Sequence, residues 1–140
     1  MPTRRMAREL ALQALFSVEI GKREPDEVLT ETFAHAGSNG THRAFIKDLV
    51  YGTLEHAQQS DQAVAPLLEG WTIERLPTID RLLLRMGMFE LAHRPLVPRP
   101  VIINEAVELA KKFSTEDSGR FVNGVLSSAM NANTHDGKKT

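Results

Sequence analysis

Apolar side chains recur three and four positions apart along most of the chain, which is the spacing of a helix buried on one face. In the first such segment the apolar stripe passes through Met6, Leu10, Ala14 and Val18, with Ala7, Ala11 and Leu15 beside it. No run alternates between apolar and polar residues over the length of a convincing strand. The pattern predicts helices over residues 3–20, from 25 onward, and over 41–68, 79–94, 101–113 and 118–131, with a short helical turn at 71–76.

The residues between these segments are typical of helix ends and loops. Pro25 is followed by two acidic residues, as in a first helical turn, and Thr78 is a candidate cap for the helix that follows it. Residues 37–40 read Gly-Ser-Asn-Gly, and residues 94–100 contain three prolines that exclude a helix there. Residues 114–117 supply capping side chains for the last helix. The sequence therefore predicts an all-α protein of six or seven helices.

Length and composition narrow the class of protein. The chain has 140 residues, of which 41% are hydrophobic and 25% charged, and we expect one domain over 1–132 followed by a disordered polar tail over 133–140. No uncharged apolar run approaches the roughly 18 residues that span a bilayer. The N-terminus has no apolar segment typical of a secretory signal, so we expect a cytoplasmic protein that is not bound to a membrane.

Charged side chains are unevenly distributed along the chain. Residues 1–23 carry five basic and two acidic side chains, whereas residues 24–74 carry two basic and nine acidic ones. Residues 75–99 again carry five basic side chains, all arginine, against two acidic ones. Two arginine-rich segments in a chain of formal net charge −1 favour local binding of a polyanion, although chance clustering of surface charge explains the pattern equally well.

The sequence lacks the motifs of common enzymes. The absence of cysteine excludes disulfides, a thiol nucleophile and cysteine-ligated metals. The five histidines match no metal-ligand spacing, and there is no P-loop, dinucleotide-binding fingerprint or nucleophile elbow. We therefore expect a protein that is not an enzyme and that has no cofactor and no metal.

The first helix carries unusual side chains opposite its core stripe. A helical wheel at about 100° per residue places Arg5, Arg8, Leu12 and Phe16 there. Arginine binds phosphate groups, and phenylalanine offers a ring to a nucleobase or to a partner's groove, so this face is a candidate binding surface. Alternatively, another helix of the same chain covers Leu12 and Phe16, or the two residues form the seam of a homodimer.

The predicted helix over 79–94 carries a second candidate face. Arg81, Arg85 and Met88 gather away from the apolar stripe of this helix. Glu90 falls on the apolar side, where we expect it to be buried and paired with an arginine.

The start of the last helix carries a third candidate. Phe121 lies about a quarter turn from the predicted core face, as counted on the wheel, and has Arg120 and Asp117 for neighbours. An arginine and a helix N-terminus both bind phosphate, and a phenylalanine ring stacks on a base. Together these features could bind a nucleotide. In the alternative interpretation, Phe121 only rims the core.

Three segments of the chain carry a specific resemblance. Residues 7–16 read ARELALQALF, and residues 79–91 read IDRLLLRMGMFEL. The most specific pair is VIINEAVELAKKF at 101–113 with FVNGVL at 121–126. In order and spacing these segments resemble the NusB family of bacterial transcription antitermination factors, and the resemblance extends over nearly the whole chain.

The resemblance implies a fold of two small packed helical bundles. It also implies binding to the boxA element of ribosomal RNA transcripts as a heterodimer with NusE, a small-subunit ribosomal protein. This complex joins NusA, NusG and RNA polymerase and suppresses premature, Rho-dependent termination.

The resemblance also assigns residues to two surfaces. The RNA-facing residues would be Arg4, Arg5, Arg8, Asp117, Arg120, Phe121 and Asn123. The residues facing NusE would be Phe16, Asp80, Arg81 and Arg85. Two alternatives remain at this point: a helical protein–protein adaptor whose arginines only keep it in solution, and the RNA-binding module of a ribosomal RNA methyltransferase-type protein. The second would require a fragment, because 140 residues leave no room for the methyl-donor-binding sheet.

Overall fold

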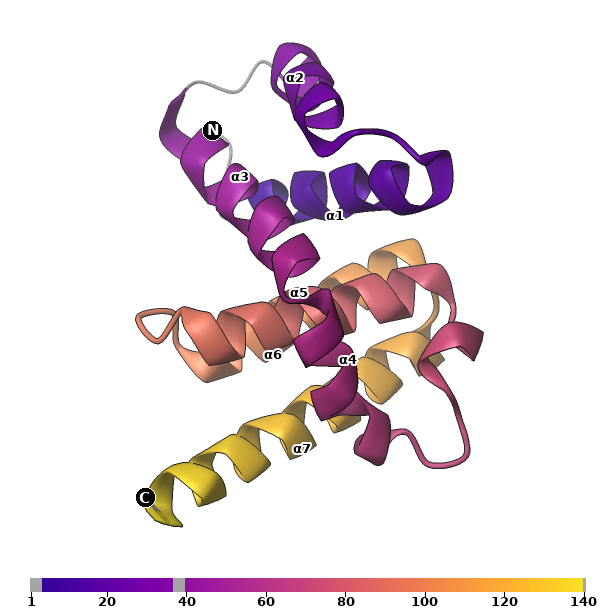
Figure 1. Cartoon of the computed structure of the whole chain (residues 1–140), viewed down its shortest axis with the longest axis vertical. Helices are drawn as coiled ribbons and strands as arrows, with labels where there is room; N and C mark the ends of the chain where they lie inside the picture. The colour runs from indigo at the N-terminus through magenta and orange to yellow at the C-terminus, as the bar shows by residue number, and fades with distance from the viewer. Residues whose placement is uncertain (1–3, 37–39, 140) are drawn as a thin grey trace. The chain divides into compact units, whose positions relative to one another are not determined.

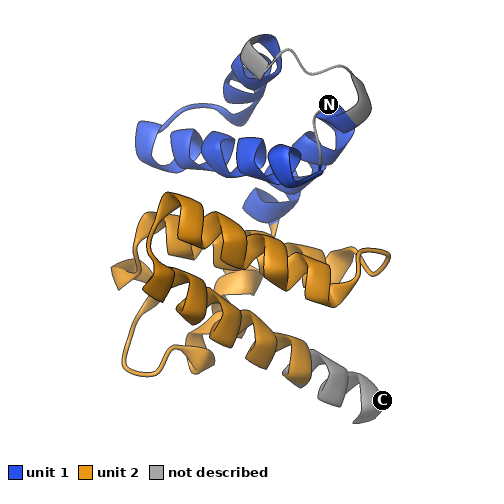
Figure 2. Ribbon diagram, turned by 180° about the vertical axis from the view of Figure 1, so that it is seen from behind, with its two compact units in different colours: residues 1–55 blue, residues 56–140 orange. Residues whose placement is uncertain are grey.

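A computed structural model describes the backbone of residues 4–36 and 40–139, and the side chains of residues 4–34 and 42–131. Within these ranges the chain forms seven α-helices and two 3-10 turns, and no strand (Figure 1). The prediction of an all-α protein is confirmed. The chain divides into two compact units, residues 1–55 and residues 56–140 (Figure 2), as expected for a fold of two small bundles.

The first unit consists of three helices: α1 (Arg4–Gly21), α2 (Pro25–Ala36) and α3 (Gly40–Glu55). α1 begins and ends within one residue of the predicted positions, and α2 begins at Pro25 as predicted. Asp26 and Glu27 stand in the first turn of α2, where the unpaired amides of a helix N-terminus favour acidic side chains. Residues 37–39 of the predicted loop lie outside the described residues.

The buried face of α1 is wider than the predicted stripe. Arg8 and Leu12, predicted to point outward, are buried at 4% and 1% exposure, whereas Met6, predicted in the core, is 51% exposed. The physical reason is that both α2 and α3 contact α1, and a helix with two neighbours buries more than one narrow stripe. The prediction of an outward stripe is therefore wrong for Arg8 and Leu12, and Leu12 is not available for a homodimer seam.

The second unit contains the other four helices and both 3-10 turns. In chain order these are α4 (Ala57–Val64), η1 (Ala65–Leu67), η2 (Ile73–Arg75), α5 (Thr78–His93), α6 (Arg99–Phe113) and α7 (Glu116–Lys139). α5, α6 and α7 all contact one another, and α4 packs on α5. The tail predicted over 133–140 falls outside the side chains that the structure describes, and its disorder stays a prediction.

The helix predicted over 41–68 is interrupted at His56. His56 has φ −105° and ψ 14°, which separates α3 from α4, and the chain then tightens into the 3-10 turn η1. The ring of His56 packs 5.5 Å from that of Phe89, centroid to centroid. No proline or glycine adjoins the break, so the apolar spacing predicted a continuous helix. The prediction is wrong at His56, where a tertiary contact accompanies the bend.

Two helix starts differ in how well their caps were predicted. Thr115 Oγ1 accepts a hydrogen bond from the Ser118 amide at 3.0 Å, which confirms a capping residue before α7. Thr78 is instead the first residue of α5, and Pro77 precedes it without a side-chain cap, so the predicted cap at Thr78 is wrong.

The close approach of α5 and α7 depends on Gly87. A Cβ atom at this position would lie 2.8 Å from Leu126 Cδ1, on a side chain that is fully buried. Because no real Cβ atom tolerates that distance, glycine allows α7 to lie against α5. α5 and α7, which carry several of the predicted site residues, therefore pack closely against each other.

Candidate functional site

Arg4 and Arg8 gather on one aromatic ring in the first unit. Their guanidinium carbons lie 4.6 Å and 5.2 Å from the centre of the Phe45 ring, which α3 supplies. Arg4 is exposed, whereas Arg8 is buried. Stacking on a ring restrains a guanidinium, so the structure presents Arg4 at the surface in a partly ordered form and uses Arg8 in packing.

The other first-unit candidates remain accessible. Arg5 is exposed, and Phe16 is 39% exposed. The side chain of Phe16 is therefore only partly buried, and its exposed part is available to contact a partner.

The first turn of α7 displays the predicted cluster of Asp117, Arg120 and Phe121. Arg120 donates a hydrogen bond to the Asp117 carboxylate, and both side chains are largely exposed. Phe121 is half-buried, while Asn123 is exposed and Val122 is fully buried. The ring is thus held at the edge of the core with part of its surface open, consistent with either role considered for it above.

Phe121 shares two surface hollows with a residue that sequence reasoning missed. The first hollow, of about 230 Å³, is lined by Trp71 and Phe121 together with Leu76, Pro77 and Asp117. The second hollow, of about 380 Å³, is lined by the same two aromatic residues with Leu67, Glu69, Arg120 and Val125. The pair formed by Trp71 and Phe121 therefore borders both hollows.

A local turn immediately precedes Trp71. Gly70 has φ +78°, a left-handed conformation that glycine adopts without strain, and the Trp71 amide donates to the Leu68 carbonyl at 3.1 Å. The indole is 56% exposed. The signal in the sequence was a single tryptophan directly after a glycine, in a segment that we predicted only as a short helical turn.

Asp80 is buried, with 4% exposure, and lines the first hollow. Its Oδ2 accepts a hydrogen bond from the Ser118 hydroxyl at 3.1 Å, which ties the first turn of α5 to that of α7. Burial raises the pKa of the Asp80 carboxyl above its ordinary value, against hydrogen bonds from Ser118 and Ser114 that lower it. The exposed partner contact that the resemblance suggested for Asp80 does not agree with this position.

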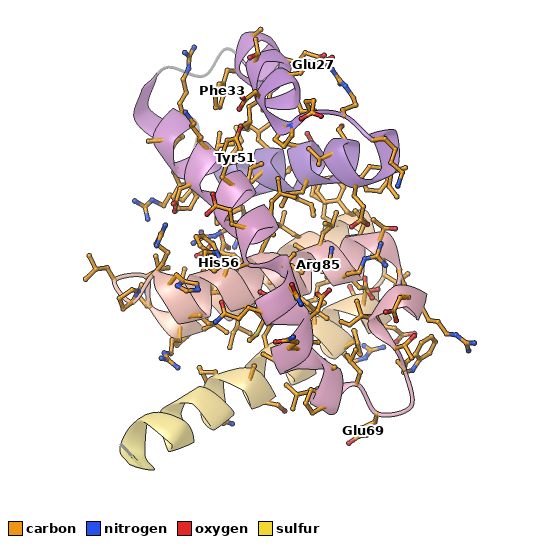
Figure 3. The ribbon with its side chains drawn as sticks, viewed as in Figure 1. Glu27, Phe33, Tyr51, His56, Glu69 and Arg85 are labelled. Carbon is orange, nitrogen blue, oxygen red and sulfur yellow. The ribbon has the colours of Figure 1, made fainter. Side chains whose placement is uncertain are left out.

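Arg81 and Arg85 are also engaged within the second unit. Arg81 donates to the Leu76 carbonyl at 3.2 Å. Arg85 makes two hydrogen bonds to Asp61, one to each carboxylate oxygen, both of 2.8 Å. Figure 3 labels Arg85 on α5, the helix that α4 contacts. The structure therefore gives both arginines structural partners, and it does not gather them with Asp80 into an exposed patch.

Other sequence expectations concern burial and metals. Glu90 is buried at 2% exposure, as predicted, and its pairing with an arginine stays a prediction. Among the described residues, no three histidine or acidic side chains lie close enough to hold a metal ion. No helix in that part of the chain is long and apolar enough to cross a membrane.

Comparison with known proteins places this geometry in a family. The model of the NusB family matches residues 5–131. The transcription antitermination protein NusB of Desulforamulus reducens is 42% identical over 123 residues, which cover 88% of this chain and 86% of the relative.

Solved structures give the same result for the fold. The solved structure of T. maritima NusB superposes with a TM-score of 0.85 at 32% identity, over 94% of this chain and 93% of that one. A chain from a crystal structure of antitermination factors NusB and NusE in complex with double-stranded RNA superposes with a TM-score of 0.83 at 28% identity, over 92% and 96% of the two chains. The agreement extends over both units.

Proposed function

Because the chain belongs to the NusB family of transcription antitermination proteins, we propose that it binds boxA RNA together with NusE and thereby suppresses premature, Rho-dependent termination in ribosomal RNA operons. In this proposal the protein acts by binding and not by catalysis. NusA, NusG and RNA polymerase are the further members of the complex. The similar solved chain in a complex of NusB, NusE and RNA supports the pairing of these two partners.

The observation that carries the RNA-binding part is the partly open Phe121 ring beside Arg120. A half-buried phenylalanine offers one face for stacking on a base, and the exposed arginine next to it is a phosphate ligand. Asp117 holds the Arg120 guanidinium from within the same helical turn. Asn123, exposed on α7, adds hydrogen-bonding capacity to this surface.

The first unit would contribute positive charge. Arg4 and Arg5 are exposed at the start of α1, and Arg4 is restrained by the Phe45 ring. Arg8 takes part indirectly in this proposal, because it is buried beneath the same ring. Phe16 is the candidate contact for NusE on α1. Asp80, Arg81 and Arg85 instead hold α5 in place through hydrogen bonds within the second unit.

The proposal is tested by titrating a labelled single-stranded boxA RNA with the protein, with and without NusE, and against a scrambled RNA of equal length. We expect preference for boxA, tighter binding with NusE, and an affinity that falls as salt rises, because phosphate contacts release counterions. Equal affinity for the scrambled RNA would contradict boxA recognition. Binding to NusE with no RNA bound in any condition would instead favour a protein–protein adaptor.

A further inference from the structure

The second unit displays two aromatic rings around adjoining hollows, although only one of the rings belongs to the proposed RNA surface. Trp71 borders both the first and the second hollow, as does Phe121. Trp71 belongs to the loop between η1 and η2, and Phe121 to the first turns of α7. Figure 3 labels Glu69, which lies in the same loop as Trp71 and lines the second hollow.

We infer that Trp71 is a second base-stacking residue, and that Trp71 and Phe121 together hold two successive bases of a single-stranded RNA in the two hollows. The inference rests on the proposed RNA-binding function and extends it to a residue and a strand type. Trp71 is 56% exposed, and an indole offers a flat apolar face together with one N–H donor, which suits contact with a ligand.

The lining of the hollows suits bases rather than a peptide segment. Aromatic side chains bind single-stranded RNA by stacking on successive bases, which every base permits because each has a flat face. The first hollow is small, at about 230 Å³, and its other walls include Leu76 and Pro77. Such a hollow fits one flat ring system, whereas an amphipathic helix needs an extended groove.

The charges around the hollows orient the strand. Two carboxylates, of Asp80 and Asp117, line the first hollow, so that hollow suits a base with hydrogen-bond donors and repels phosphate. Arg120 lines the second hollow and supplies the cation for a phosphate there. The phosphate therefore passes on the Arg120 side of Phe121, and continuity with the proposed RNA surface argues for RNA over a protein partner.

The chain contains one tryptophan, so its fluorescence reports on Trp71 directly. We expect a short single-stranded boxA RNA to quench the tryptophan emission, with the same concentration dependence as binding measured through a label on the RNA. A hairpin-closed duplex of the same sequence should not quench it, because its base faces are covered. Equal quenching by the duplex, or unchanged emission at saturating single-stranded RNA, would overturn the inference.

Substitutions give an independent test. Trp71→Ala should weaken RNA binding by roughly 5- to 150-fold, the loss of one base stack, whereas Trp71→Phe should keep most of the affinity. The salt dependence should stay the same in both, because no phosphate contact is removed. Leu96→Ala is the matched control: Leu96 is an apolar side chain of the same unit, 96% exposed, between α5 and α6, and its loss should leave binding unchanged.

Two further outcomes separate this inference from the proposed function. If Trp71→Ala keeps its melting temperature and RNA affinity but loses NusE binding, the ring contacts a protein partner and the inference is wrong. If the wild-type protein binds RNA and Trp71→Ala binds it equally well, the proposed function is retained and the stacking role of Trp71 is contradicted. If the wild-type protein binds no RNA at all, both the proposed function and the inference are contradicted. A fluorescence titration of the wild-type protein detects this outcome before any variant is made.

Discussion

The imidazole rings of His56 and His93 lie 4.1 Å apart, centroid to centroid, with their planes inclined by 41°. His56 precedes α4 and His93 ends α5, so the contact joins two helices of the second unit. Phe89 packs against both rings, and His93 Nε2 lies 3.3 Å from Gln59 Oε1. At this distance His56 disfavours the charged form of His93.

This contact predicts a loss of stability on mild acidification. Burial lowers the pKa of His93, and the nearby His56 and Arg94 lower it further, from an ordinary value of 6.5. Between the lowered pKa and 6.5 the unfolded chain binds more protons at this histidine than the folded chain does. The contribution of neutral His93 to the free energy of unfolding is therefore present above pH 6.5 and is lost as the pH falls below it. Denaturant unfolding of wild type and of His93→Gln should give a difference that shrinks towards low pH.

His56→Gln provides the control for this explanation. Removing one of the charges that lower the pKa of His93 should move that pKa back towards its ordinary value, which a nuclear magnetic resonance titration of His93 measures. A wild-type advantage over His93→Gln that stays constant between neutral and mildly acidic pH would contradict the prediction.

Arg85 and Asp61 are predicted to matter for stability more than for partner binding. Their paired hydrogen bonds of 2.8 Å are partly shielded, with exposures of 19% and 27%. Asp61→Asn should lower the free energy of unfolding by about 1–3 kcal/mol, because it removes a charged acceptor. Arg85→Lys should not retain that stability, since lysine cannot make two parallel bonds.

The matched control is Arg75→Ala, at an exposed position in the same unit, which should change stability by no more than about 0.5 kcal/mol. Calorimetric binding to NusE is then measured at temperatures where each variant is folded. Loss of NusE binding by folded Asp61→Asn would mean that the pair does more than brace α5 against α4.

The helices were predictable because their apolar spacing and end residues are local properties of the sequence. The break at His56 was not, because it accompanies contacts with Phe89 and His93, which lie more than thirty positions away in the sequence. The burial of Arg8 was missed for the same reason. A wheel separates two faces of a helix, but it does not reveal that α2 and α3 both cover α1, or that Phe45 receives the Arg8 guanidinium.

The three arginines at the start of α1 should now separate into two classes. Arg4→Ala with Arg5→Ala should weaken RNA binding and make its salt dependence shallower by up to about one phosphate contact for each arginine. Stability should change by no more than about 1 kcal/mol, because both side chains are exposed and Arg4 gives up a cation–π contact at the surface. Denaturant melts and RNA titrations with NusE present measure both quantities.

Arg8→Ala is the contrasting variant. Its side chain is buried against Phe45, so its loss should destabilise the first unit by about 1–3 kcal/mol through lost packing and a lost cation–π contact. An unchanged melting temperature in Arg8→Ala would contradict the structural role. Unchanged RNA affinity in the Arg4 and Arg5 double variant at low salt would count against an RNA surface on α1.

At the start of α7 the sequence predicted the residues but not their setting. Phe121 was singled out from its wheel position and from the FVNGVL motif that it begins, and Arg120 was singled out as its neighbour. Trp71 was not, because nothing local links position 71 to position 121. The two residues come to the same hollows only in the folded chain, in which η1 contacts α7. Asp80 was assigned to a partner, yet it is buried and its Oδ2 accepts the Ser118 hydroxyl, whereas its Oδ1 has no hydrogen-bond partner among the described residues.

Phe121→Ala decides between the two roles considered for this ring. As a rim of the core alone, the ring would contribute about 1–3 kcal/mol of stability, less than the roughly 3–5 of a fully buried phenylalanine, and its loss would affect RNA binding only through unfolding. As a stacking residue it should instead contribute about 1–3 kcal/mol to RNA affinity. Because part of the ring is open to both hollows, we expect the affinity loss with only a small change in melting temperature.

Phe113→Ala is the matched control for that variant. Phe113 is also a half-buried phenylalanine of the second unit, at the end of α6, and it lines neither hollow. Its loss should lower stability and leave the RNA affinity of the folded protein unchanged. Denaturant melts and RNA titrations on both variants separate the effects, since stacking requires that only Phe121→Ala binds RNA more weakly once both proteins are fully folded. A large stability loss in Phe121→Ala with wild-type affinity at full folding would refute the stacking role and return the ring to the core.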